Sequence, residues 1–180
     1  PLYAVNRLLV RHGMRVLREG KRVGLHALLE AARLRRADLS FSTLSFVLGP
    51  RINASGRLAS ASHALRMLTT ENEREGFALA FELEQLNRER GQIQEAIVRE
   101  AEGLLPQVVR SQSAVFCDPS WHEGVLGIVA TRMVEKSGVS AVVLTEHEGL
   151  AKGSLRASKG KDVLAALHAC RDLLAGFGGH

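Results

Sequence analysis

Three short strings in the sequence combine side chains of the types that hold phosphate groups in proteins. The first, Gly-Pro-Arg-Ile-Asn-Ala-Ser-Gly-Arg at 49–57, is expected to be a loop between helices. Arg51 and Arg57 can each give a phosphate two hydrogen bonds, Asn53 adds an amide, and the glycines let the backbone approach closely. The alternative is a structural turn whose arginines pair with carboxylates of the long helix that follows. The residues alone leave this choice open.

A histidine occupies the second string, Trp-His-Glu-Gly-Val-Leu-Gly at 121–127. This string follows an expected strand and opens an expected helix, which is where α/β proteins commonly place ligand sites. His122 can therefore donate a hydrogen bond to a phosphate or carry a proton. The alternative is a packed histidine beside Trp121 that binds no ligand.

The third string, Gly-Ser-Leu-Arg at 153–156, falls on an expected strand. Side chains two residues apart on a strand share a face, so the Ser154 hydroxyl and the Arg156 guanidinium can together hold a phosphate. The string Gly178-Gly179-His180 is a further candidate, with a helix C-cap as its alternative. Taken singly, each of these strings has low specificity.

The sequence lacks the motifs that usually carry metal or nucleotide chemistry. Its four aspartates form neither the paired-Asp nor the Asp-His-His grouping that holds two catalytic divalent metals. There is no P-loop, no nucleophile elbow and no dinucleotide fingerprint. Cys117 and Cys170 have neither disulfide-framework nor zinc-site spacing, so both are expected to be buried free thiols. We expect this segment to assemble no two-metal centre.

Positive charge is concentrated in the first third of the chain. Residues 1–66 hold 12 Lys and Arg against 3 Asp and Glu, whereas the remainder holds 12 against 16. Clustered arginine is typical of surfaces that bind phosphate-bearing partners, although solvated Arg-rich helix faces are the common alternative. No run approaches the roughly 18 apolar residues of a membrane span, and no leader pattern opens the chain. We therefore expect a cytoplasmic protein with no membrane contact.

The first third of the chain reads as short helices. Residues 6–34 place apolar side chains at helical spacing, with glycine interruptions. Asp38 or Ser40 can cap a further helical stretch through Phe46. That stretch should end at Gly49-Pro50, because proline disfavours helix in the residue before it.

Helical spacing returns at 61–68 and then continues in a much longer helix. Thr70 and Glu73 form the Thr-x-x-Glu pattern of a capping box, which starts this helix near Glu71. Apolar residues recur at intervals of three and four through Leu104, over about 33 residues or roughly 50 Å. Such a helix more often braces two lobes than forms half of a coiled coil.

The pattern after Pro106 changes to β-α-β-β-α. Strands are expected at 114–117, 139–144 and 150–156, and helices at 125–134 and 162–174, with Asp162 near the cap of the last one. We place the boundary between the two lobes at 105–111.

Taken in order, these strings resemble the RecJ branch of the DHH phosphoesterase superfamily over essentially the whole chain. The residues at 1–7 and 24–29 look like the segment just after the fourth metal-binding motif of a DHH domain. The string at 49–57 resembles the family's Pro-Arg-x-Asn-Ala-x-Gly-Arg loop, and 86–90 resembles its Leu-Asn-x-x-Arg helix. The strings at 121–127, 153–156 and 178–180 resemble successive motifs of the DHHA1 domain. Six matches in one order make the resemblance specific.

The resemblance implies a manganese- or magnesium-dependent phosphodiesterase that digests single-stranded DNA from the 5′ end in recombination and repair. In this family the DHH lobe holds the metals and the DHHA1 lobe closes over the strand, so the metal ligands are implied to precede this segment. The implied catalytic residues are Arg51, Asn53, Arg57 and His122, and the implied nucleic-acid or phosphate-binding residues are Gly153, Ser154, Arg156, Gly179 and His180. Ala157 departs from the pattern, in which a serine often follows the arginine.

The expected fold class is α/β (α+β). Residues 1–70 would be the helical C-terminal part of a DHH domain with its Arg-rich loop, 71–105 a long connecting helix, and 106–180 a small mixed DHHA1 domain truncated at Gly-Gly-His. The segment itself should bind rather than cut. The alternatives are a DHH-family nanoRNA or cyclic-dinucleotide phosphodiesterase, which generally lacks the long helix, and a non-catalytic nucleic-acid-binding module. Single-stranded DNA is the expected partner, and single-strand-binding protein or a helicase are further candidates.

Overall fold

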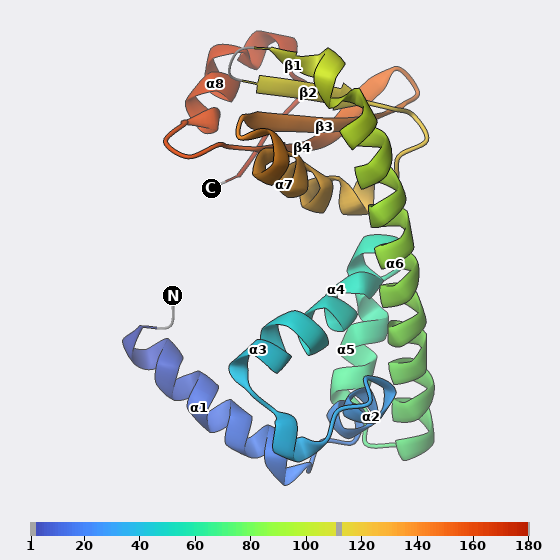
Figure 1. Cartoon of the computed structure of the whole chain (residues 1–180). Coiled ribbons are helices and arrows are strands. Elements are labelled where there is room, and N and C mark those ends of the chain that lie inside the picture. Colours follow the sequence, from blue (N-terminus) through green and yellow to red (C-terminus); the bar gives the residue numbers. More distant parts are fainter. Residues whose placement is uncertain (1–2, 111–112, 180) are drawn as a thin grey trace. The chain divides into compact units, whose positions relative to one another are not determined.

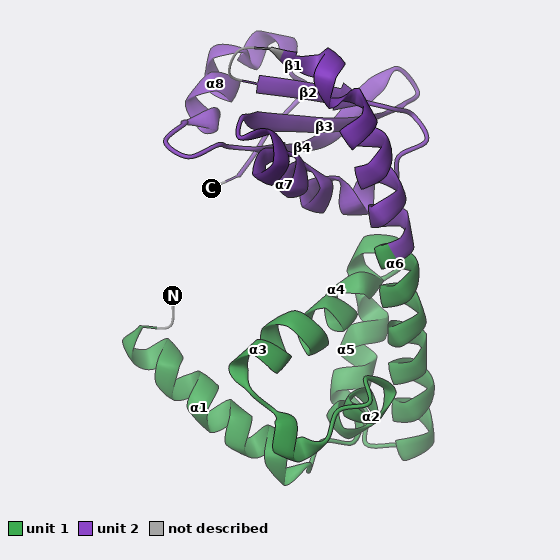
Figure 2. Cartoon of the chain, in the orientation of Figure 1, with its two compact units in different colours: residues 1–91 green, residues 92–180 purple. Residues whose placement is uncertain are grey.

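The chain forms two compact units, residues 1–91 and 92–180, which divide inside one long helix (Figures 1 and 2). A computed structural model describes the chain except for residues 1–2, 111–112 and 180, and it leaves the side chain of residue 110 undescribed. The helix that crosses the division is α6 (Glu73–Val108), with 36 residues. The division of the sequence into 1–70, 71–105 and 106–180 stays a prediction about domains.

Unit 1 is built from helices. They are α1 (Ala4–Glu19), α2 (Val23–Ala31), the short α3 (Phe41–Thr43), α4 (Gly49–Leu58), α5 (Ala61–Thr69) and the first part of α6. Gly20 ends α1 with a φ of 69°, a left-handed conformation that suits glycine at a helix C-terminus. The core gathers Leu28, Leu48, Met67 and Leu83, all with side chains almost completely buried. The predicted helices at 6–34 and 61–68 are thereby confirmed.

The string at 49–57 is a helix, so the predicted loop was wrong. A π-helical turn (Leu44–Leu48) continues from α3 and leads directly into α4, with Pro50 in the first turn of the new helix. Proline is tolerated there because its missing N–H would have no acceptor in a first turn. The residue before it, Gly49, has no β-carbon to clash with the proline ring, so it keeps helical angles.

The cap of α6 differs from the predicted capping box. The Asn72 side chain accepts a hydrogen bond from the Glu75 backbone N–H at 3.0 Å, and the helix begins at Glu73. Thr70 takes part through its side chain, donating to a Glu75 carboxylate oxygen at 2.6 Å. The sequence contains two overlapping patterns of this kind, Thr70 with Glu73 and Asn72 with Glu75. Asparagine is the stronger N-cap residue, so the second pattern forms the cap.

Unit 2 contains a four-stranded sheet of order β1-β2-β3-β4. The strands are β1 (Val109–Arg110), β2 (Ser113–Cys117), β3 (Ser140–His147) and β4 (Leu150–Arg156). Strands β2 and β3 are parallel and are joined through α7 (Leu126–Ser137), whereas β3 and β4 form an antiparallel hairpin. The hairpin turn places Glu148 and Gly149 at positive φ, as a tight turn of this hand requires. The predicted mixed α/β fold is confirmed.

One face of this sheet packs against helices. Buried side chains of β2 and β3 meet those of α7 and of the second part of α6, including Phe116, Val129 and Ala101. Trp121 is buried at the edge of this core, and its indole N–H donates to Glu100 on α6 at 2.7 Å. A continuous apolar core therefore fixes the start of α7 against the sheet.

The cysteines and the last helix differ in part from what the sequence predicted. Cys117 and Cys170 are free thiols, but both are exposed, because Cys117 points away from the helix-covered face of β2. The last helix, α8 (Val163–Ala169), is capped by Asp162 as predicted. It stops well before residue 174, and only a short 3-10 turn follows. None of the described helices is long and apolar enough to cross a membrane.

Candidate nucleic-acid interface

Ser154 and Arg156 lie beside the first turn of α7. A β-carbon added at Gly127, in that turn, would lie 3.1 Å from Nη2 of Arg156 and 3.3 Å from Oγ of Ser154. Both side chains come from β4, where their residues pair with Val143 and Ala141 of β3. The two side chains therefore share a face, as the sequence predicted, and Gly127 leaves room for them over the helix start.

This arrangement has the components of an anion site. A 3-10 turn (Glu123–Val125) leads directly into α7, and the Leu126 N–H donates to the Glu123 carbonyl, so this helix start offers an anion the positive end of the α7 dipole. The Arg156 side chain is exposed and donates to its neighbouring carbonyl at Leu155, 3.0 Å away, and no carboxylate among the described residues pairs with it. A guanidinium, a hydroxyl and a helix N-terminus together suit a phosphate group.

His122 lies exposed just before this helix start. Its Nδ1 accepts a hydrogen bond from the backbone N–H of Gly124 at 3.1 Å. An accepting Nδ1 carries no proton, so a neutral ring must carry its proton on Nε2. His122 can therefore donate from Nε2 to a ligand oxygen, which keeps its predicted phosphate contact chemically possible.

A lysine near the same helix start is already paired. Lys152 on β4 lies 2.8 Å from a Glu123 carboxylate oxygen. The hydrogen bond from Lys152, followed by its charge and those of His122 and His147, lowers the pKa of Glu123. Glu123 thus stays ionised near neutral pH and opposes the binding of anions directly beside it, so a phosphate is better placed toward Arg156.

The two glycines predicted at the phosphate site have different surroundings. A β-carbon at Gly153 would overlap the Val143 carbonyl oxygen, so glycine is needed there for close pairing of β4 with β3. Gly179 lines a cavity of about 430 Å³ together with Arg156 and Gly178. Gly178 and Gly179 thus lie near Arg156. His180 lies outside the described residues.

Arg51 of unit 1 is held in an ion pair. Its Nε lies 2.6 Å from Glu84 of α6, with both side chains mostly buried, and its Nη1 donates to the Val47 carbonyl at 2.8 Å. The other oxygen of Glu84 accepts from Arg88 at 2.9 Å. For Arg51, this is the pairing with the long helix that the sequence left open.

Asn53 and Arg57 are exposed one turn apart on α4, so their side chains share a face. The pKa of Arg90 on α6 is lowered, mainly by partial burial and in addition by the positive charge of Arg57. Arg90 also donates to Asn87 at 3.1 Å. Two guanidinium groups close enough to repel each other would be stabilised by an anion between them.

Three residues at these sites were missed by sequence reasoning. They are Gly127, Glu84 and Arg90. Gly127 and Arg90 stand inside strings that the sequence analysis singled out, so each string carried the signal but not the role of the individual residue. Glu84 had no local signal, because its partner Arg51 is 33 residues away.

The described residues offer no metal site. No group of three or more His, Cys, Asp or Glu side chains that could hold an ion occurs in the part of the chain that the structure describes. The manganese or magnesium implied by the family resemblance therefore does not fit the residues of this segment.

Comparison with known proteins finds relatives of one kind. Residues 108–180 match the DHHA1 domain family. Over its whole length the chain is 37% identical to the single-stranded-DNA-specific exonuclease RecJ of Bacillus subtilis, of which it spans 23%, and 38% identical to that of Escherichia coli, of which it spans 33%. The chain thus spans about a quarter to a third of the length of these curated relatives.

Solved structures agree with the sequence comparison. A crystal structure of RecJ in complex with Mg²⁺ from Thermus thermophilus matches all of this chain and 28% of that one, with a TM-score of 0.87 and 35% identity. A crystal structure of exonuclease RecJ bound to manganese matches all of this chain and 44% of that one, with a TM-score of 0.82 and 36% identity.

Proposed function

Because the chain belongs to the RecJ branch of the DHH/DHHA1 phosphoesterases, we propose that it is a segment of an exonuclease specific for single-stranded DNA. The proposed enzyme digests from the 5′ end and serves recombination and repair. One observation in this chain carries the proposal: Ser154 and Arg156 lie together over the N-terminus of α7. That geometry suits a terminal phosphate, which is the group that marks a 5′ end.

In this proposal unit 2 holds the 5′-terminal phosphate. Arg156 and Ser154 bind its oxygens, His122 donates from Nε2, and Gly179 lines the cavity beside Arg156. His180 stays a predicted phosphate ligand. A phosphate fixed in this way would set the position of the first phosphodiester bond relative to the rest of the enzyme. The hydrolytic metals, manganese or magnesium, would be held by residues outside this segment.

We assign the unit 1 residues to the path of the strand. Asn53 and Arg57 on the exposed face of α4 would contact the backbone near the scissile bond, and Arg90 would assist Arg57. Arg51 would act through Glu84 by holding α4 against α6. Single-strand-binding protein or a helicase would be partners of the whole enzyme, which we place in the cytoplasm.

The alternative functions are less well supported. A nanoRNA or cyclic-dinucleotide phosphodiesterase would share the DHHA1 strings, but the 36-residue α6 and full-length similarity to RecJ proteins favour the exonuclease. A non-catalytic binding module would explain the basic first third, but the same similarity argues against it.

Binding of the chain to three labelled ligands tests the proposal: a 5′-phosphorylated single strand, its 5′-hydroxyl counterpart and a duplex. We expect the phosphorylated strand to bind about tenfold more tightly than the hydroxyl strand, with most of that preference lost in Arg156→Ala, since charge-assisted hydrogen bonds are strong. Arg132→Ala is the matched control, because Arg132 is an exposed arginine of α7 that pairs with Glu135. Equal affinity for all ligands, unchanged by Arg156→Ala, would reject the phosphate site.

A further inference from the structure

Two cavities of unit 1 share a histidine and an arginine. One cavity, of about 210 Å³, lies between the end of α2 and the following segment and is lined by His26, Leu29, Glu30 and residues 33–36. The other, of about 270 Å³, is lined by Gly20, Val23, His26, Arg36, Glu73 and Phe77. Because His26 and Arg36 line both, the cavities are neighbours on one surface of this unit.

Three arginines and three carboxylates lie on or beside this surface, but only one of the arginines is paired with a carboxylate. Arg35 is paired with Asp38 and donates to its two carboxylate oxygens through hydrogen bonds of 2.8 and 3.0 Å. Arg33 and Arg36 are exposed, and neither has an acceptor or ion-pair partner among the described residues. Of the two glutamates present, Glu30 lies 3.8 Å from His26, while Glu73 lines the second cavity. Two guanidinium groups are therefore available to an external anion.

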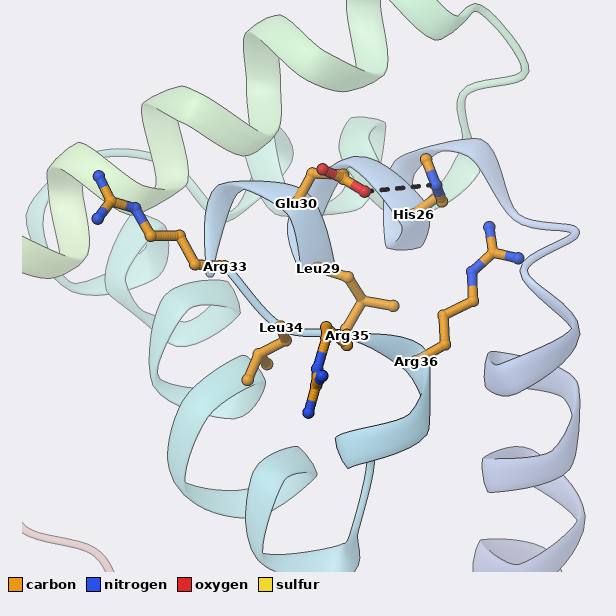
Figure 3. A pocket seen from close by; sticks show the side chains of 7 residues that line it. All are labelled: His26, Leu29, Glu30, Arg33, Leu34, Arg35 and Arg36. Atoms are coloured by element: carbon orange, nitrogen blue, oxygen red, sulfur yellow. Dashed lines mark ion pairs between the residues drawn. The ribbon is translucent and has the colours of Figure 1, made fainter.

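Both arginines are associated with backbone in a left-handed conformation, at Gly20 and at Arg33 itself. The Arg36 guanidinium lies directly against Gly20, where a β-carbon would overlap it. Arg33 has a φ of 55° just after α2, a left-handed position where glycine is the usual residue. Figure 3 shows Arg33, Arg35 and Arg36 pointing in different directions around the cavity. Such a spread suits the successive phosphates of a chain better than one small ion.

Exposed aromatic rings adjoin the same surface. The Phe77 ring packs edge-on against His26, with centroids 6.1 Å apart, and is 44% exposed. Phe81 follows one turn later on α6 and is 61% exposed. Rings one helical turn apart lie on the same helix face. Aromatic rings beside a positively charged groove are the usual means of holding unpaired bases, whereas a duplex keeps its base faces covered.

We propose that unit 1 carries a second binding site for single-stranded nucleic acid, in which Arg36 and Arg33 hold backbone phosphates and Phe77 with Phe81 stacks on bases. This site is separate in its residues from the terminal-phosphate site of unit 2, and it reads neither the 5′ end nor the base sequence. Its effect is to increase the affinity of the chain for any single strand.

The test uses the 180-residue chain and strands of about twelve nucleotides, a length within the range that such sites cover. Each strand has a 5′-hydroxyl, so that the terminal-phosphate site contributes little. One strand is oligothymidylate, and the other is an abasic strand with the same phosphates but no bases. Affinities are measured by fluorescence anisotropy over a series of salt concentrations, for Arg36→Gln and Phe77→Leu.

The two substitutions should separate the two kinds of contact. Arg36→Gln should weaken binding of both strands about fivefold at low salt and reduce the salt slope by about 0.7, the value for one phosphate contact on a single strand. Phe77→Leu should weaken oligothymidylate binding about fivefold and leave abasic binding unchanged, because only a base can stack.

Matched controls distinguish this site from general positive charge. Arg7→Gln removes another exposed arginine of unit 1 that has no partner among the described residues. Phe41→Leu alters a ring of similar exposure, 47%. Both should change affinity less than twofold, and circular dichroism should show every variant folded.

Either of two results would overturn the inference: equal losses in Arg36→Gln and Arg7→Gln, or no loss of oligothymidylate affinity in Phe77→Leu. Failure of the proposed exonuclease role would appear elsewhere, as a missing preference for the 5′-phosphate.

Discussion

At the scale of the residue, a substitution of Gly127 should change phosphate binding without lowering the stability of unit 2. Alanine is a better helix former than glycine by roughly 0.5–1 kcal/mol, so Gly127→Ala should leave the stability of unit 2 unchanged or slightly higher. Its β-carbon would crowd the Arg156 guanidinium and the Ser154 hydroxyl at 3.1 and 3.3 Å. We therefore expect part of the roughly tenfold preference for a 5′-phosphorylated strand to be lost, measured by anisotropy alongside thermal melting.

The outcome that would contradict this is a full phosphate preference in a stable Gly127→Ala variant. Gly138→Ala is not a suitable control, because Gly138 ends α7 at a φ of 73°. Gly103→Ala is suitable, since Gly103 lies in α6 with open space around it.

Sequence reasoning was most informative where a role depends on local spacing. Ser154 and Arg156 share a strand face because they are two residues apart, and Asp162 caps α8 because its side chain reaches three residues ahead. The partner of Arg51 could not be found in this way. Glu84 lies 33 residues further on, and only the packing of α4 on α6 brings the two together.

At the scale of the element, the string at 49–57 shows why a composition rule can fail. Two glycines and a proline are typical of a loop, yet tertiary packing makes these residues helical. Ala54 and Ser55 are completely buried, and the Ser55 hydroxyl donates to the Ile52 carbonyl at 3.1 Å. Burial of small residues lets α4 pack closely, which the glycine and proline count could not reveal.

The start of α6 provides a test of stability against pH. Hydrogen bonds from the Thr70 hydroxyl and then from Arg66 lower the pKa of Glu75 below its ordinary value of 4.5. Because the folded pKa lies below the unfolded one, this interaction stabilises the fold at pH values above about 4.5 and is lost as pH falls through the folded pKa. Glu75→Gln cannot titrate, so its melting temperature should fall less than that of the native chain below pH 4.5.

This comparison is made by following thermal unfolding between neutral pH and about pH 3, a range that spans the ordinary pKa of glutamate. Glu71→Gln is the control, because Glu71 is an exposed glutamate next to the same cap. Parallel curves for the native chain and Glu75→Gln would show that the cap contributes nothing to acid sensitivity.

At the scale of the whole molecule, the basic excess lies in one unit, and each unit has its own hydrophobic core. The basic excess of the first third, 12 cations against 3 carboxylates over residues 1–66, falls entirely within unit 1. The two hydrophobic cores have no residue in common, although α6 contributes to both. The sequence predicted the two lobes and the long helix from periodicity. It did not predict that the compact units divide at 91, because a continuous helical pattern contains no sign of where its packing partners change.

Separate cores predict separate unfolding, and one tryptophan makes this measurable. Gly24 is buried in unit 1, where a β-carbon would overlap the Met67 carbonyl oxygen, so Gly24→Ala should destabilise unit 1 by about 2–3 kcal/mol through overpacking. Gly13→Ala is the matched control, because Gly13 lies in α1 with open space around it. Trp121, the single tryptophan of the chain, is buried in the core of unit 2. Its fluorescence therefore follows unit 2, whereas far-ultraviolet circular dichroism is dominated by the helices of unit 1 and α6.

In urea, Gly24→Ala should lower the midpoint seen by circular dichroism and leave the fluorescence midpoint close to that of the native chain. Gly13→Ala should move neither midpoint downward. Equal shifts of both signals in Gly24→Ala would mean that α6 couples the two units into one cooperative transition. In that case a substitution in unit 1 could alter phosphate binding in unit 2 through stability alone. Binding of every unit 1 variant would then have to be compared at equal folded fraction, since only folded chains present the site.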